Sequence, residues 1–253
     1  MRERASGRPP AFLARPWRLW RPLWSRADWL GGWFFHLGAL AVMHLITGGG
    51  YMVVSRINAA RNHTVWDPAL PIDKALPAVG WTIFPYVTYY VYGILTILAT
   101  PRTALGRERL IALYQGLIAM SLVVFTCFLL VPCEIHIVRD LPSELVEGPG
   151  WIPWLFRWLH GVDRPWNAWP SHHACISLGI AAYVSRSVAH PLAKVAMWVA
   201  WVLLAVSILT TKQHFVFDLV TGVALGWATW NIVIRRALDS ADGHPYGSGR
   251  TLT

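Results

Sequence analysis

Long apolar runs separated by short polar segments dominate this chain. A helix that crosses a bilayer needs about 20 mostly apolar residues. Six segments reach or approach that length: 30–54, 79–100, 110–132, 171–189, 193–211 and 214–234. The first three contain no Asp, Glu, Lys or Arg. The pattern therefore predicts an all-α, polytopic membrane protein with six transmembrane helices.

Two of these segments contain a charged residue. Arg186 lies near the end of segment 171–189, where its long side chain has to reach the membrane surface. Asp218 is the single acid of segment 214–234. An acid within a span costs on the order of 3 kcal/mol near the helix centre, and less near the end. Asp218 is therefore expected to have a partner.

The loop between the third and fourth segments, residues 133–170, is the longest on its side. Within it apolar residues recur at helical spacing, and Arg157 and His160 lie off that stripe. The spacing predicts a short helix that lies in the outer interface of the membrane. The stripe consists of Trp151, Trp154, Leu155, Trp158, Leu159 and Val162.

Composition and charge agree with a membrane protein and add its orientation. Only 14% of the residues are charged, whereas soluble domains have about 25%. With six spans, 15 of the 22 Lys and Arg residues lie on the side of the two termini. The positive-inside rule then places both termini in the cytoplasm. The membrane is expected to be a bacterial cytoplasmic (inner) membrane. The net charge of +9 reflects topology and contact with anionic lipids, and no nucleic-acid partner is expected.

The chain divides into one membrane domain, residues 29–236, and two tails. Residues 1–28 form a basic, Trp-rich tail, and residues 237–253 form a polar, Gly-rich tail. Leu13, Trp17, Trp20 and Trp24 have helical spacing, which fits an interfacial helix or a partly ordered tail. Cys133 and Cys175 are both expected near the outer face. They form either a disulfide or, more commonly for buried cysteines, free thiols.

The stretch HFVFD places His214 and Asp218 four residues apart, on one face of the predicted sixth helix. A carboxylate on one imidazole nitrogen selects the tautomer and makes the other nitrogen a better nucleophile or base. The alternative is a structural hydrogen bond at the end of a helix.

The stretch PSHH lies at the start of the predicted fourth helix. Ser171 is a favourable N-cap, and the free N–H groups behind it form an anion site that the helix dipole reinforces. His172 and His173 lie in the first turn, where an imidazole is able to protonate a leaving group. Taken alone, the stretch is better explained by an ordinary helix cap with interfacial histidines.

Together the two stretches contain the parts of a phosphoryl-transfer site that needs no metal or other cofactor. Both lie on the outer face in the six-helix topology. Gly222 and Gly226 on the sixth helix, with Gly179 and Ala182 on the fourth, allow close helix approach, which would bring His214 near His173. Small residues also occur in general membrane packing.

These stretches resemble two motifs of the type 2 phosphatidic acid phosphatase superfamily. PSHH at 170–173 is similar to its PSxH motif, and HFVFD at 214–218 is similar to its HxxxD motif. The region from about Cys133 to Trp230 resembles most the branch of inositolphosphorylceramide synthases and related bacterial membrane phosphatases. The resemblance implies that His214 attacks phosphorus, Asp218 orients it, His173 is the general acid and base, and Ser171 with adjacent amides holds the phosphate.

The remaining motif positions depart from the family pattern. RWLHGVDRP fits the first motif with Arg157 in place of lysine, but lies unusually close to PSHH. Ile208 stands where the third motif has arginine, and His172 stands where the second motif usually has glycine. A phosphate dianion still needs cations. The predicted phosphate-binding residues are Ser171, Arg139, Arg164, Lys212 and His172.

The sequence thus predicts a lipid phosphatase or headgroup phosphotransferase that acts on a lipid phosphate or diphosphate at the outer face of the membrane. Hydrolysis and transfer remain open, as does the identity of the lipid. One rival is a haem or redox protein, because His36 and His44 lie on the first span. Another is an inactive scaffold or transporter on the same fold.

Overall fold

The computed structural model describes residue 13 and residues 15–243. Over this part of the chain the regular elements are all helical, which confirms the predicted all-α class. The main helices are α1 (Arg21–Trp24), α2 (Trp33–Arg61), α3 (Pro71–Ala75), α4 (Ile83–Val87), α5 (Tyr89–Leu98), α6 (Ala104–Leu130), α7 (Ser143–Val146), α8 (Trp151–Val162), α9 (His172–Ser187), α10 (Pro191–Thr210), α11 (Val216–Thr229) and α12 (Arg235–Gly243). Short 3₁₀ turns and one π turn, η5 (Trp230–Ile234), join some of them.

Five segments of the described chain are long and apolar enough to cross a membrane: Trp29–Arg61, Gly80–Leu98, Ala104–Leu130, Pro191–Thr210 and Val216–Gly243. They match five of the six predicted spans. The last one continues through η5 and α12 and so runs past residue 236, where the membrane domain was predicted to end. The count of six spans remains a prediction, because α9 has only 16 residues and rises about 24 Å, less than the roughly 30 Å of a bilayer core.

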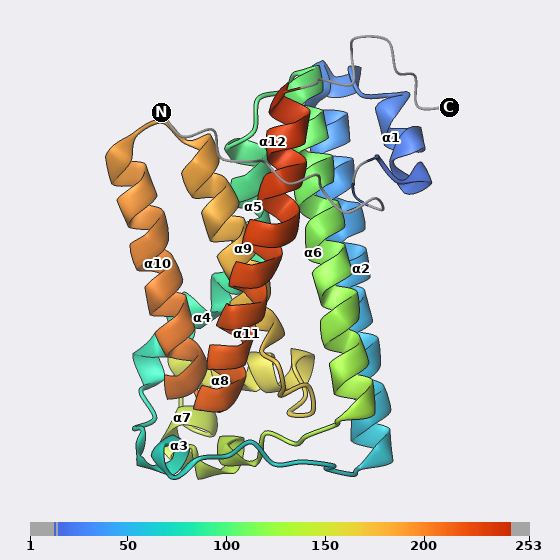
Figure 1. The fold of residues 1–253 in the computed structure, drawn as a ribbon. Coiled ribbons are helices and arrows are strands. Elements are labelled where there is room, and N and C mark those ends of the chain that lie inside the picture. The colour runs from blue at the N-terminus through green and yellow to red at the C-terminus, as the bar shows by residue number, and fades with distance from the viewer. Residues whose placement is uncertain (1–12, 14, 244–253) are drawn as a thin grey trace, which may run out of the picture.

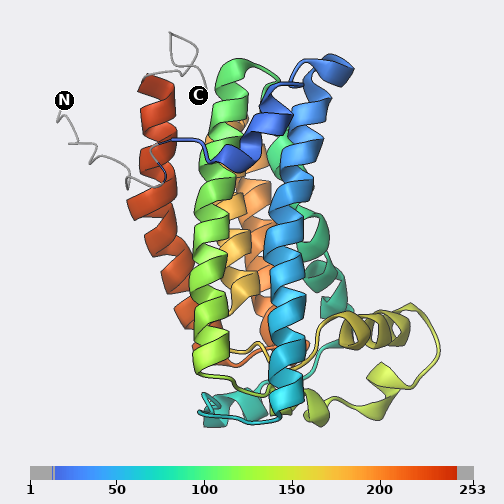
Figure 2. The ribbon, with the colours of Figure 1, turned by 90° about the vertical axis from the view of Figure 1, so that its right-hand side faces the viewer.

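The short helix α9 occupies the centre of the bundle. Every residue from His172 to Val184 is buried, and α9 packs against α5, α6, α10 and α11 (Figure 1). Other helices therefore enclose this part of α9, which has no broad solvent or lipid face. At its far end Arg186 forms ion pairs with Asp239 and Asp242 of α12. The outer helices α2 and α6 lie side by side along one flank (Figure 2).

The connections of the bundle gather at its two ends. The segments 62–79, 131–171 and 211–215, with α3, α7 and α8, lie together at the lower end in Figure 1, while α1 and α12 lie at the upper end. Lys212 joins two of the lower segments, because its ammonium donates to the carbonyl oxygens of Asp73 and Leu76 at 2.7 and 2.6 Å. The two histidine stretches therefore lie at the same end of the bundle.

The described part of the N-terminal segment packs against α6. Trp20 is fully buried, its indole N–H donates to Gln115 Oε1 at 2.9 Å, and Gln115 Nε2 donates to the Arg15 carbonyl. The segment contains one 3₁₀ turn, Arg18–Trp20, and the single turn α1. The outer parts of both predicted tails, residues 1–12, 14 and 244–253, lie outside the described residues.

The predicted helix in the long loop is present as α8. Its inward side consists of Pro153, Phe156 and Leu159, whereas Trp151 and Trp154 are 76% and 49% exposed. The predicted stripe therefore splits: Leu159 faces the bundle and the tryptophans face outward. Arg157 donates to the carbonyls of Val146 and Gly148 and so holds the preceding loop. The interfacial position of α8 remains a prediction.

Candidate active site

The start of α9 has the predicted cap. Ser171 is the N-cap residue, and its hydroxyl accepts a hydrogen bond from the Ala174 amide at 3.3 Å. The Ser171 amide donates to the Asp218 carbonyl at 3.1 Å, which ties the cap to α11. The first amides of a helix have no backbone partner within it, and the Ser171 hydroxyl satisfies that of Ala174, so the His172 and His173 amides are the ones left for an anion.

Glycines on α11 allow this approach, as the sequence predicted. A Cβ at Gly222 would lie 2.5 Å from the Ser171 carbonyl oxygen, and one at Gly226 would lie 3.0 Å from the Cα of Cys175. Gly179 has a different neighbour from the one expected, because a Cβ there would meet Leu117 of α6 at 2.8 Å. The glycines of α11 therefore account for its close approach to the start of α9.

His214 lies in the turn before α11, which corrects the prediction that it shares a helix face with Asp218. The helix begins at Val216, and Asp218 caps its first turn by accepting from the Phe215 amide at 3.1 Å. The same oxygen, Oδ2, lies 3.4 Å from His214 Nδ1. The spacing of four residues thus brings the two side chains together through a capping turn, and the predicted His–Asp contact is present.

His173 and His214 meet across the interface between α9 and α11. The distance from His173 Nδ1 to His214 Nε2 is 3.3 Å, and both side chains are almost completely buried. His173, His214 and Asp218 consequently form a continuous line of contacts. We call these three residues the histidine relay.

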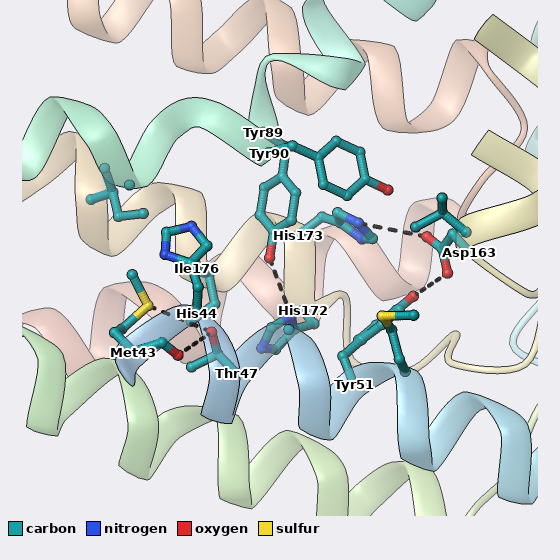
Figure 3. A pocket seen from close by; sticks show the side chains of 15 residues that line it. Met43, His44, Thr47, Tyr51, Tyr89, Tyr90, Asp163, His172, His173 and Ile176 are labelled. Carbon is teal, nitrogen blue, oxygen red and sulfur yellow. Dashed lines mark hydrogen bonds and ion pairs between the residues drawn. The ribbon is translucent and has the colours of Figure 1, made fainter. Parts of the chain in front are cut away.

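The other nitrogen of His173 faces a group that the sequence analysis did not single out. His173 Nε2 lies 3.6 Å from Asp163 Oδ2 and 3.4 Å from the Tyr86 hydroxyl. Tyr51 donates to the other carboxylate oxygen of Asp163 at 2.7 Å (Figure 3). These residues come from α2, α4 and the end of α8. The only sequence signal was an acid between an amphipathic segment and Arg164-Pro165.

His172 points away from the histidine relay. Its Nε2 lies 2.9 Å from the Ser121 hydroxyl of α6, and its Nδ1 lies 3.3 Å from the Tyr89 hydroxyl of α5. Tyr51 stacks on its ring. Both ring nitrogens thus have hydroxyl neighbours, and its role in phosphate binding remains a prediction.

The predicted cations lie around the site but not in contact with the histidine relay. Arg139 is exposed and pairs with Glu134. Arg164 is exposed, and its backbone carbonyl accepts from the Ser55 hydroxyl at 3.3 Å. The buried Lys212 ammonium is occupied by two carbonyl groups. Their roles as phosphate ligands remain predictions.

Two cavities approach the site, and Asp163 lines both. The first, of about 220 Å³, is mostly apolar and lies between α2, α5 and α9, with His172 and His173 in its wall (Figure 3). The second, of about 420 Å³, lies on the loop side and is lined by Arg139, His160 and Gln213. Burial raises the pKa of Asp163 to about 6, and the same cause lowers the pKa of His160.

The sequence also left open the state of the cysteines and the role of His36 and His44. Cys127, Cys133 and Cys175 are free thiols, so the disulfide alternative is wrong. His36 is buried against aromatic rings, and His44 Nδ1 contacts the Leu40 carbonyl. Among residues 13 and 15–243, no group of three or more His, Cys, Asp or Glu side chains is placed to hold a metal ion.

The line of His173, His214 and Asp218, with Ser171 capping α9, joins the two motifs that resembled one family. The model of that family, the PAP2 superfamily, matches residues 112–241, just over half of the 253 residues. This chain belongs to the PAP2 superfamily.

The matched region runs from within α6 into α12 and includes every residue of the histidine relay. A comparison with curated proteins found no match. Members of the PAP2 superfamily are phosphatases, which supports activity on phosphate esters in a membrane protein in general terms. The resemblance to the branch of inositolphosphorylceramide synthases remains a prediction.

Proposed function

We propose that this PAP2 protein is a phosphatase or phosphotransferase that acts on a lipid phosphate or diphosphate at the outer face of the membrane, through a phosphohistidine on His214. The observation that carries the proposal is the buried contact of His173 Nδ1 with His214 Nε2 at 3.3 Å, backed by Asp218 at 3.4 Å. This arrangement supports the proposed roles of His214 as nucleophile, Asp218 as its orienting carboxylate and His173 as proton donor.

The first half of the reaction needs these three groups and the start of α9. Asp218 holds the proton on His214 Nδ1, so that Nε2 presents its lone pair to phosphorus. As the N–P bond forms, the bond from phosphorus to the leaving oxygen breaks, and His173 gives that oxygen a proton. The phosphoryl group enters between the two imidazoles, where Ser171 and the free amides of α9 lie beside it, and so replaces their direct contact.

The second half restores the enzyme. His173, now neutral, takes a proton from water as the water oxygen attacks phosphorus. The bond from phosphorus to His214 then breaks, and inorganic phosphate leaves. A lipid or polyol hydroxyl in place of water gives a transferred headgroup by the same step, so the histidine relay supports both outcomes.

The apolar cavity supports a lipid substrate. It reaches His172 and His173 from the side of α2 and α5, and three of its lining residues on α2, His44, Gly48 and Met52, are exposed. An apolar chain placed there would have its phosphate end beside the histidine relay. Arg139 lines the second cavity. To bind a phosphate there, its guanidinium would have to break its ion pair with Glu134.

The test is release of phosphate in detergent with excess EDTA from a panel of lipid phosphates and diphosphates. We expect wild type to hydrolyse at least one lipid, and His214→Ala to lose activity completely. His190→Ala is the matched control, because His190 is an exposed histidine just before α10, at the other end of α9 from His173.

Three results would contradict the proposal: loss of wild-type activity with EDTA, activity that survives His214→Ala, and loss in both histidine variants. If wild type releases no phosphate, diacylglycerol, ceramide and inositol are added as acceptors, and a transferred headgroup is sought. A phosphoryl group bound to His214 is detected as an acid-labile ³²P label. It should be present in wild type that is stopped during turnover and absent from His214→Ala.

A further inference from the structure

Asp163 is a buried carboxylate outside the histidine relay. It follows the last residue of α8, and its side chain is only 8% exposed. Burial of a charge is costly unless other groups compensate it. Within residues 13 and 15–243 no lysine or arginine forms an ion pair with Asp163, so its neighbours are hydroxyl groups and one imidazole.

The neighbours hold both carboxylate oxygens in one orientation. Tyr51 of α2 donates to Oδ1 at 2.7 Å, and Tyr86 of α4 donates to Oδ2 at 3.4 Å. Oδ2 also lies 3.6 Å from His173 Nε2. Two helices therefore aim this carboxylate at the nitrogen of His173 that faces away from His214. Figure 3 shows the contacts of Asp163 with Tyr51 and His173.

We propose that Asp163 is a positioning residue for His173 and forms with it a second His–carboxylate pair, opposite in direction to the pair of His214 and Asp218. This inference rests on the proposed function, because it concerns the general acid and base of the same reaction. Asp163 acts through His173 and does not itself contact the phosphoryl group.

The two nitrogens of His173 have different tasks in this arrangement. Nδ1 faces His214 and the space that the phosphoryl group enters, so this nitrogen has to gain and lose the catalytic proton. The other proton then has to stay on Nε2. A carboxylate beside Nε2 holds that proton in place and stabilises the imidazolium that exists before the leaving group departs.

A purely structural role for Asp163 makes different predictions. In that case the carboxylate only joins α8 to α2 through Tyr51, and its loss would lower stability without changing the protonation of His173. Asp163→Asn separates the two cases. The asparagine side chain still accepts from Tyr51, but it cannot carry the negative charge or hold the imidazolium.

The first experiment measures hydrolysis of dioleoyl phosphatidate in detergent micelles with EDTA. We expect Asp163→Asn to lower kcat roughly 10²-fold with KM within about twofold of wild type, because a general acid contributes about 10²–10⁴-fold. Asp140→Asn is the matched control, since it makes the same change at an exposed carboxylate of the same loop. It should retain most of kcat. An Asp163→Asn variant with wild-type kcat would overturn the inference.

A double-mutant cycle tests whether Asp163 acts through His173. In the His173→Ala background, Asp163→Asn should cause no further loss of kcat, because the group that it positions is absent. Losses that multiply in the double variant would show that Asp163 acts independently of His173, and would overturn the inference.

The pH profile supplies a readout that a structural role would not change. Because burial raises the pKa of Asp163 to about 6, its carboxylate becomes ionised as pH rises through about 6, and kcat should rise with it. Asp163→Asn should lose this rise, and its alkaline limb should move to lower pH because the imidazolium is less stabilised. The titratable or charged groups that surround Asp163 are Tyr51, Tyr86, Tyr89, Tyr90, His173 and His214, and, on the side of the second cavity, Arg139, Glu147 and His160.

A measurement without turnover separates this inference from the proposed function. In protein labelled with ¹⁵N-histidine, the signals of His173 are assigned by their absence in His173→Ala. Wild type should show His173 protonated on Nε2, and Asp163→Asn should shift it toward the other tautomer or a mixture. The spectrum tests the role of Asp163 even if dioleoyl phosphatidate is not hydrolysed, and an unchanged His173 tautomer in Asp163→Asn overturns the inference. Absence of activity toward every lipid and acceptor overturns the proposed function.

Discussion

Single side chains in this protein carry both structure and chemistry. Asp218 Oδ2 accepts from the Phe215 amide and also contacts His214, so one oxygen starts α11 and orients the proposed nucleophile. Asp73 has a related role. Its carboxylate accepts from the Val216 amide at 2.7 Å, and its backbone carbonyl accepts from the Lys212 ammonium. Asp218 and Asp73 therefore both hold the turn that contains His214.

Lys212 either stabilises the fold or binds phosphate, and the two roles predict different results for its substitution. Lys212→Met removes the ammonium from two buried carbonyl groups, and an unsatisfied buried polar group costs about 1–3 kcal/mol. We expect a lower thermal midpoint in detergent, with KM for lipid phosphate little changed. Lys74→Met, at an exposed neighbour in α3, is the control. A higher KM with an unchanged midpoint would instead identify Lys212 as a phosphate ligand.

At the scale of elements, the site depends on how closely two helices approach. The histidine relay joins α9 to the turn before α11, and the Ser171 cap is packed against Gly222. Close approach needs a small residue here, because the neighbouring atoms belong to backbone that has no flexible side chain to move aside.

Gly222→Ala tests this contact. The new Cβ would lie 2.5 Å from the Ser171 carbonyl oxygen, so α11 has to move away from the start of α9. We expect kcat to fall at least tenfold with a lower thermal midpoint, because a displacement of about 1 Å can cost about 10²-fold. Gly49→Ala on α2 is the matched helix control, since its Cβ would meet only a Leu45 methyl group at 3.8 Å. Equal activity in the two variants would contradict this account.

At the scale of the whole molecule, the two loop segments with site residues, 131–171 and 211–215, lie at one end of the bundle, and α12 ends at the other (Figure 1). The Lys and Arg distribution predicts that the end with the site faces away from the cytoplasm. The apolar helices identify an integral membrane protein, and its orientation is a prediction that labelling can test.

The orientation test uses single cysteines in a protein without its three native ones. His63→Cys lies beside the site end and Ala104→Cys at the opposite end, and both positions are exposed. We expect a membrane-impermeant maleimide to label His63→Cys in intact cells and Ala104→Cys only after permeabilisation. The reverse pattern would place the site in the cytoplasm.

Much of this architecture was predictable because its causes are local. A helix in a membrane satisfies its own backbone, so apolar length alone located five spans, and the Ser171 cap needed only the residues around it. The contact between His214 and Asp218 also follows from a short spacing, although a capping turn and not a helix face produces it.

The sequence by itself therefore determined the helical membrane class, the two motifs and the residues of the histidine relay. The tertiary structure decided which groups surround that relay. Asp163, Tyr51 and Tyr86 are distant in the chain from one another and from His173, and each alone is an ordinary residue. Only helix packing brings them to the second nitrogen of His173, because contacts between remote segments depend on how whole helices fit together and not on local periodicity.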